Sequence, residues 1–180
     1  MKTTTASQDP ALFQKIQEII REIDIEITTT VTPDGALRSR PMVTADFSDD
    51  GQIWFFTSDD SEKAHDLSEE HGVNLSYSDP GSHRYVSVTG NATVVHDDER
   101  ASDLWDDNLS AFFPRGLDDP HLALICVRIE TAEFWDFGAA NKRRRGGGPE
   151  AKAGGAQNGN GDDDGEHHAK VDIRATPSSG

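Results

Sequence analysis

Two side chains suited to binding phosphate follow an apolar segment near the middle of the chain. The apolar run IWFF at 53–56 ends at Thr57, and Ser61 and Lys63 come shortly after it. Serine commonly caps the N-terminus of a helix, where free backbone N–H groups and the helix dipole favour an anion. A lysine in the first helical turn is mildly unfavourable unless an anion offsets its charge. The spacing therefore indicates a phosphate site at a strand-to-helix junction.

A simpler interpretation of this junction needs no ligand. Asp59, Asp60 and Glu62 can complement the helix dipole by themselves, while Lys63 points into water as most lysines do. The residue types alone leave both interpretations open.

The elements that hold this junction follow from periodicity. Apolar residues at steps of three and four predict an amphipathic helix that begins at Pro10. From Ile23 to Val31 the period changes to two, which predicts a half-buried strand. The PDG turn at 33–35 then leads into a returning strand from Ala36 to Phe47. Arg38 and Arg40 share one face of that strand, either at a binding site or as solvated charges.

Four more strands and two more helices are predicted further along. The strands are expected at 53–57, 73–77, 83–96 and 121–135, and the helices at 61–71 and from Asp97 or Asp98 to Phe112. Gly90 indicates a bulge or a close backbone approach. The aromatic residues of the last helix are expected in the core, and the long last strand is placed to be shared between two sheets or subunits. Hairpin connections favour an antiparallel barrel over a doubly wound sheet.

Five ordered motifs resemble one known family. They are RSRPM at 38–42, WFFT followed by SxK at 54–63, YVSVTGNA at 85–92, FFPRGLDDP at 112–120 and AEFWD at 132–136. Over roughly residues 11–138 the chain resembles the pyridoxamine 5'-phosphate oxidase-like superfamily, and within it the bacterial general stress protein branch. The resemblance implies a mainly β fold with flanking helices, a six-stranded antiparallel FMN-binding split β-barrel.

The resemblance also implies which residues contact the flavin. Arg40 matches an arginine that contacts FMN, and Trp135 matches a tryptophan near the cofactor. The full set of expected cofactor-binding residues is Arg40, Pro41, Met42, Val43, Phe56, Thr57, Ser61, Lys63 and Trp135. Family members build the site from two chains, which implies a homodimer, and FAD or a deazaflavin are alternatives to FMN.

The function that the resemblance implies is flavin-dependent oxidoreduction of an unidentified small molecule, with no catalytic side chain assigned. A non-catalytic protein that stores or senses flavin is the alternative. Two departures from the true oxidases imply that pyridoxamine 5'-phosphate is not the substrate: Ala45 stands where they have lysine, and DFGAANKRRR follows Trp135 where they have an Arg-Leu-His-x-Arg segment. Glu62 often corresponds to an arginine in the oxidases, which implies weaker FMN binding.

The composition limits the partners. The chain has 33 Asp and Glu against 17 Lys and Arg, a formal net charge of −16, so neither nucleic acid nor an anionic membrane is expected to bind. Cys126 is the single cysteine and is expected to be a small buried side chain. No apolar run approaches the roughly 20 residues of a membrane span, and no signal peptide is recognised, so a cytoplasmic protein is expected.

The sequence divides into a flexible leader at 1–10, one folded domain at 11–138 and a tail at 139–180. The tail is rich in glycine, asparagine and charge and is expected to be disordered. No metal site is expected: His65 and His71 lie on different faces of a predicted helix, and His167 and His168 belong to the tail, which offers no fixed coordination geometry.

Overall fold

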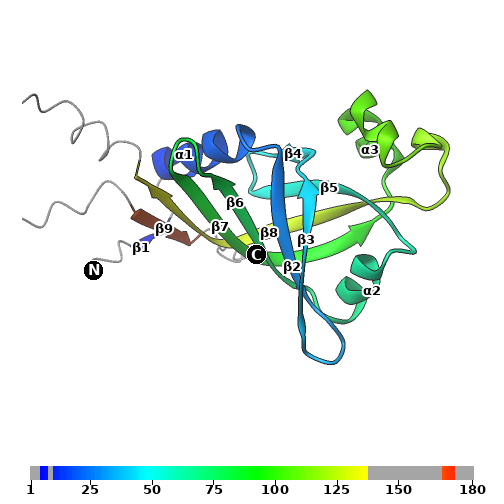
Figure 1. The fold of residues 1–180 in the computed structure, drawn as a ribbon, viewed down its shortest axis with the longest axis horizontal. Coiled ribbons are helices and arrows are strands. Elements are labelled where there is room, and N and C mark those ends of the chain that lie inside the picture. Colours follow the sequence, from blue (N-terminus) through cyan, green and yellow to red (C-terminus); the bar gives the residue numbers. More distant parts are fainter. Residues whose placement is uncertain (1–4, 8–9, 138–167, 173–180) are drawn as a thin grey trace, which may run out of the picture.

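A mainly β fold is seen in the computed structural model, which describes residues 5–7, 10–137 and 168–172 (Figure 1). The strands are β1 Thr5–Ser7, β2 Ile25–Val31, β3 Leu37–Val43, β4 Asp46–Phe47, β5 Gln52–Ser58, β6 Gly72–Asp79, β7 Arg84–Val95, β8 Leu122–Asp136 and β9 His168–Asp172. The helices are α1 Pro10–Arg21, α2 Glu62–Glu69 and α3 Asp98–Leu104, with 3-10 turns η1 Asp107–Ala111 and η2 Gly116–Asp118. Within these ranges, no helix is long and apolar enough to cross a bilayer.

Six antiparallel strands form the predicted split barrel. Their hydrogen-bonded order is β5, β8, β7, β6, β2 and β3. In the described part of the chain, no strand ladder joins β3 to β5, so the barrel stays open between them. The long β8 pairs with β5 along its first half and with β9 along its second half, and all three strands belong to one sheet. Sharing of β8 between two sheets is therefore not seen among the residues that the structure describes.

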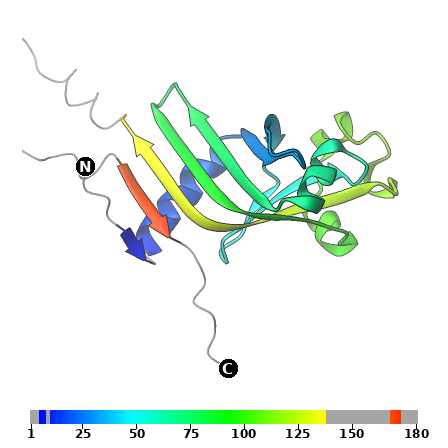
Figure 2. The same cartoon turned by 90° about the horizontal axis from the view of Figure 1, so that it is seen from below.

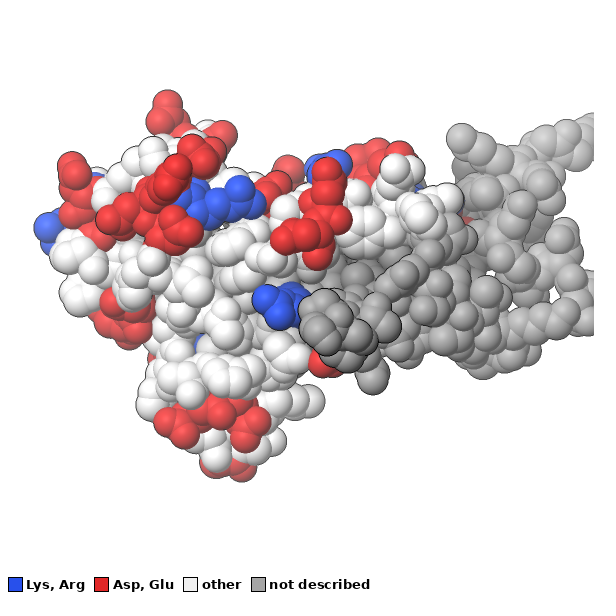
Figure 3. Space-filling view, turned by 180° about the vertical axis from the view of Figure 1, so that it is seen from behind, with Lys and Arg blue, Asp and Glu red and all other residues white. Residues whose placement is uncertain are grey.

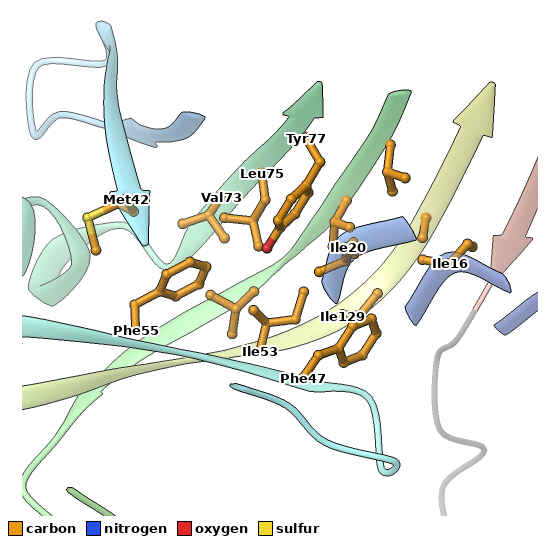
Figure 4. Packing of buried hydrophobic residues seen from close by; sticks show 14 of the residues in the cluster. Ile16, Ile20, Met42, Phe47, Ile53, Phe55, Val73, Leu75, Tyr77 and Ile129 are labelled. Atoms are coloured by element: carbon orange, nitrogen blue, oxygen red, sulfur yellow. The ribbon is translucent and has the colours of Figure 1, made fainter. Parts of the chain in front are cut away.

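The core fills the barrel and continues under α1. Tyr77, Phe55 and Ile53 project inward from the strands, and Ile16 and Ile20 on one face of α1 complete this cluster (Figure 4). Figure 2 shows α1 crossing the sheet on the side where β9 lies. The apolar face that the sequence predicted for α1 therefore packs against the barrel and covers it.

Strand β2 inverts the usual relation between polarity and burial. Its alternating pattern predicted a half-buried strand, but the buried side chains are Glu26, Thr28 and Thr30. The isoleucines point outward, with Ile25 57% exposed and Ile27 41% exposed. On β3, Leu37 and Val43 lie opposite this strand and are also exposed. The outward face of the β2–β3 hairpin is therefore apolar.

The prediction that the third helix extends to Phe112 is wrong. Asp97 caps α3 as expected, because its side chain accepts a hydrogen bond from the Arg100 N–H. The helix ends at Leu104, however, and Asp106 accepts from the Asn108 N–H to begin η1. An aspartate that binds its own neighbouring backbone competes with a continuing helix.

The predicted leader and tail lie mostly outside the described residues. Where they are described, the structure differs from the expected disorder: residues 168–172 form β9, which pairs antiparallel with β8, and residues 5–7 form β1, parallel to β9. The physical reason is an available edge. β5 pairs with β8 only as far as Arg128, so β9 can pair with the same edge of β8 beyond that residue.

Candidate functional site

The junction of β5 and α2 forms as the sequence predicted. Ser61 is the N-cap of α2, and its Oγ accepts a hydrogen bond from the Ala64 N–H at 3.3 Å. The same hydroxyl donates to the Ser58 carbonyl at 2.6 Å. Thr57 is completely buried beside it, with 3.3 Å between the two hydroxyl oxygens. Ser61 therefore stabilises the turn itself, and its hydroxyl would have to leave Ser58 to donate to a ligand.

Lys63 is half-buried and does not point into bulk water. Its side chain lies on the wall of a pocket, and burial lowers the pKa of the ammonium group, with the nearby Arg40 charge lowering it further. Within the described ranges, no carboxylate lies within 4 Å of its Nζ. The structure thus places an uncompensated lysine in the first turn of α2, where the helix dipole is also positive.

Arg40 is held by a carboxylate that the sequence analysis missed. Its Nη2 donates to Asp66 Oδ2 at 3.0 Å, and Thr30 Oγ1 donates to the same oxygen at 3.0 Å. Arg38 Nη1 lies 3.6 Å from the other oxygen of Asp66 and 3.2 Å from Glu62 Oε2. The Nη1 of Arg40 is buried and has no hydrogen-bond partner among the described residues. Arg40 is therefore oriented on one side and able to donate on the other.

Asp66 stays ionised although it is buried. Burial alone would raise the pKa of its carboxyl, but hydrogen bonds from Arg40 and Thr30 and the charges of the two arginines outweigh that effect and lower the pKa. Its spacing from Lys63, one helical turn, is the signal that could have placed it on the inward face of α2. Among the described residues, Arg38 and Arg40 pair with Asp66 and Glu62, whereas Lys63 has no carboxylate within 4 Å. On the face drawn in Figure 3, Asp and Glu cover more of the surface than Lys and Arg do.

A pocket of about 230 Å³ lies at the opening between β3 and β5. It is lined by Ile25, Pro41, Met42, Val43, Phe56, Lys63, Leu109, Phe112 and Phe113. Five of the predicted site residues, Pro41 to Val43, Phe56 and Lys63, therefore meet in one place. The expectation of a core position is wrong for Phe112, which is 69% exposed and lines the pocket.

Trp135 is not brought to this pocket within one chain. Phe56 pairs with Leu124 near the start of β8, whereas Trp135 pairs with Tyr85 near its end. At about 3.3 Å per residue, the two ends are about 36 Å apart along the strand. A single copy of the chain therefore separates Trp135 from the other predicted site residues.

Comparisons with known proteins agree with this architecture. Residues 12–144 match the family model described as pyridoxamine 5'-phosphate oxidase like. The structure resembles a putative general stress family protein from Xanthomonas campestris at 26% identity and a TM-score of 0.60, covering 83% of this chain and 97% of that one. It also resembles the general stress FMN/FAD binding protein from Xanthomonas citri at 23% identity and a TM-score of 0.61, covering 84% and 100%.

A curated relative matches over a shorter stretch. Protein bli-3 from Neurospora crassa is 28% identical over 117 residues, which is 60% of this chain and 56% of the relative. The chain thus spans little more than half the length of that relative.

Proposed function

The chain belongs to the pyridoxamine 5'-phosphate oxidase-like family, and from this premise we propose that it is a general stress protein that binds FMN between β3 and β5. The observation that carries the proposal is the half-buried Lys63, without a carboxylate partner in the described part of the chain, at the wall of an apolar pocket. The similar protein from Xanthomonas citri is described as FMN/FAD binding.

The residues present fit a flavin phosphate. Pro41, Met42, Val43 and Phe56 offer an apolar surface for a flat ring, and small-molecule sites are usually built this way. Lys63, the unpartnered Nη1 of Arg40 and the N-terminus of α2 offer positive charge and donors for the phosphate. When bound, the flavin supplies the redox chemistry, and the protein supplies binding and electrostatics.

The site is proposed to be completed by a second copy of the chain. The outward face of the β2–β3 hairpin exposes Ile25, Ile27, Leu37 and Val43, and two of these, Ile25 and Val43, also line the pocket. A second copy that covers this face would close the pocket at the same time. It would also allow Trp135 of one copy to approach the flavin of the other, which the distance along β8 forbids within one chain.

The proposed activity is oxidation or reduction of a small molecule. A non-catalytic role in storing or sensing flavin is the second candidate, because Lys63 is the single titratable side chain among the residues that line the pocket. Purified protein separates these two: reduction of the bound flavin by NADPH, followed by reoxidation by an added acceptor, supports the enzyme. The cofactor released on denaturation identifies FMN, FAD or a deazaflavin.

Replacing Lys63 tests the phosphate assignment. A charge-assisted hydrogen bond to phosphate contributes about 1.5–3 kcal/mol, so Lys63→Ala should weaken FMN binding about tenfold or more. The measurement is the Kd from quenching of flavin fluorescence. Arg21→Ala is the matched control, because it removes an equal charge from a side chain that binds the Phe47 carbonyl away from the pocket. An equal Kd for Lys63→Ala and Arg21→Ala would reject the assignment.

The protein is further proposed not to oxidise pyridoxine or pyridoxamine 5'-phosphate. Ala45, at the position of the oxidase lysine, packs against the cluster of Phe56 and Leu124 and offers no charge. The pocket's single cation, Lys63, is assigned to the flavin phosphate, so none of its lining residues remains for a substrate phosphate. We expect the FMN-loaded protein to form no pyridoxal 5'-phosphate from either compound in oxygenated buffer. Turnover at about 1 per second or faster would contradict this expectation.

A further inference from the structure

Outside the pocket, four metal-ligating side chains from three segments meet beside the β5–α2 junction. Asp59 and Asp60 follow β5, His96 follows β7, and His121 precedes β8. His121 Nδ1 lies 2.9 Å from Asp59 Oδ1, and His96 Nε2 lies 3.4 Å from Asp59 Oδ2. One ligand atom from each of Asp59, Asp60 and His121 lies within 4.8 Å of the other two.

Backbone hydrogen bonds, and not only side-chain contacts, hold this cluster in position. The Asp59 N–H donates to the His121 carbonyl at 2.9 Å, directly beyond the last β5–β8 pair, Ser58 and Leu122. On the other edge of β8, Val95 pairs with Leu124, which brings His96 to the same end of the sheet. The carboxylates and imidazoles are therefore held together by two strand ladders.

The spacing and chemistry of these groups suit a small divalent cation. Bonds of about 2.0–2.1 Å from nitrogen and oxygen to Zn²⁺ put the ligand atoms of a tetrahedral site roughly 3.3 Å apart. The distance between two of the proposed ligand atoms, His121 Nδ1 and Asp59 Oδ1, is 2.9 Å and lies close to that spacing. Two carboxylates match the charge of a divalent ion, and an imidazole ligand favours Zn²⁺ over Mg²⁺ or Ca²⁺.

We propose that Asp59, Asp60 and His121 bind a divalent transition-metal ion of the Zn²⁺ type, with His96 orienting the Asp59 carboxylate from its other oxygen. The remaining coordination positions are left to water, since the cluster is exposed. The ion would tie the loop after β5 to the start of β8. That loop leads directly into Ser61 and Lys63, so the site would stiffen the junction independently of whether a flavin is bound there.

The test is a Zn²⁺ titration of the full chain by calorimetry after treatment with EDTA. Because His167 and His168 lie beside Asp162 to Asp164 in the sequence, the titration is made in a His167→Ala/His168→Ala background. We expect one Zn²⁺ per chain, with no competition from millimolar Mg²⁺. His121→Ala should weaken binding by at least about tenfold, the scale of effect seen even when groups around a metal's ligands are changed. His71→Ala, another exposed histidine, should leave the Kd unchanged.

Substituting Co²⁺ provides a readout of geometry. Visible absorption of bound Co²⁺ should appear in the parent and in His71→Ala, and should be lost in His121→Ala. If His121→Ala fails to fold by circular dichroism, Asp60→Asn replaces it, with the same expected loss. Equal Zn²⁺ affinity in the parent and the ligand variant overturns the proposal. Zn²⁺ binding that disappears in the His167→Ala/His168→Ala background overturns it equally, because the ion then belongs to the tail.

Discussion

Glu26 is a carboxylic acid enclosed in the barrel. Its Oε1 accepts a hydrogen bond from Thr28, whereas its Oε2 is buried without a hydrogen-bond partner among the described residues. Burial raises the pKa of this carboxyl to about 8, and hydrogen bonds from Thr28 and the Ser76 backbone lower it only in part. Glu26 is therefore mostly protonated at neutral pH, which avoids an uncompensated charge in the core.

This protonation makes stability depend on pH. The ordinary carboxyl pKa is 4.5 and the folded value is about 8, so between them the folded state holds an extra proton. The contribution of Glu26 is complete below pH 4.5 and is lost as the pH rises to about 8, at up to about 1.4 kcal/mol per pH unit. Glu26→Gln keeps the shape and removes the titration. Its free energy of unfolding, relative to the parent, should therefore increase from pH 5.5 to pH 8.

The measurement is urea unfolding of both proteins at several pH values in this range. The difference between the two free energies is the relevant quantity, because other titrating groups are common to both chains. A difference that stays constant with pH would show that Glu26 is already ionised in the fold.

For single residues, the sequence predicted the structural roles that depend on local spacing. It missed the roles that depend on packing between distant elements. The N-cap role of Ser61 was predictable because its partner, Ala64, is three residues away. The burial of Glu26 and the pairing of Asp66 with Arg40 depend on strands and helices that are distant in sequence. Because charged residues are rarely buried, their residue types argue against the burial of Glu26 and of Asp66.

Gly90 lets β7 change its register against β8. The pairing shifts between Thr89 and Gly90, where the sequence predicted a bulge or close approach. A Cβ at Gly90 would lie 2.3 Å from the Arg128 carbonyl oxygen, well inside the 3.0 Å that Cβ contacts essentially never fall below. The bulge therefore requires glycine at this position, because a backbone atom cannot move aside as a flexible side chain can.

Gly90→Ala should lower the free energy of unfolding by about 1–3 kcal/mol, the usual cost of overpacking. Gly72→Ala is the matched control in the neighbouring strand, since a Cβ there meets nothing within 4 Å. Chemical denaturation of the three proteins compares them directly. Equal changes in both variants would mean that the close approach to Arg128 does not require glycine at position 90.

Elements marked by local turn residues such as proline and glycine were predictable from the sequence. Elements that form only by pairing with a distant strand were not. The PDG turn at 33–35 forms as predicted, with Gly35 at φ +83° and its N–H bonded to the Thr32 carbonyl. Strand β9 escaped prediction because its short, polar sequence carries no clear strand signal. What defines β9 is the edge of β8 beyond Arg128, where the pairing with β5 has ended.

On the scale of the whole molecule, the apolar face of the β2–β3 hairpin is the feature that a single copy leaves uncovered. The barrel itself was predictable from its hairpins and motifs. The inverted faces of β2 were not, because alternation shows that a strand has two different faces and does not show which one meets the core. A large exposed apolar patch that adjoins a pocket is typical of an interaction site.

Ile27→Asp should convert the proposed dimer into a monomer and reduce its flavin content, because a charge at the centre of this face cannot be buried against a second copy. Sedimentation velocity gives the mass, and the absorbance of the bound flavin gives its occupancy. Thr93→Asp adds the same charge at an exposed position of β7 and should change neither quantity. A parent protein that is monomeric and still binds FMN when dilute would refute the dimer.

The burial of the polar face of β2 affects which register the β2–β3 hairpin adopts as the chain folds. If the β2–β3 hairpin slipped by one residue against β6, Ile25 and Ile27 would enter the barrel and Glu26 would face water, so the burial of these three side chains does not by itself oppose the slip. A slipped chain, however, presents threonines and a carboxylate where its partner needs isoleucine. In the proposed dimer, a second copy would therefore bind chains in the observed register, and slipped chains would remain unpaired.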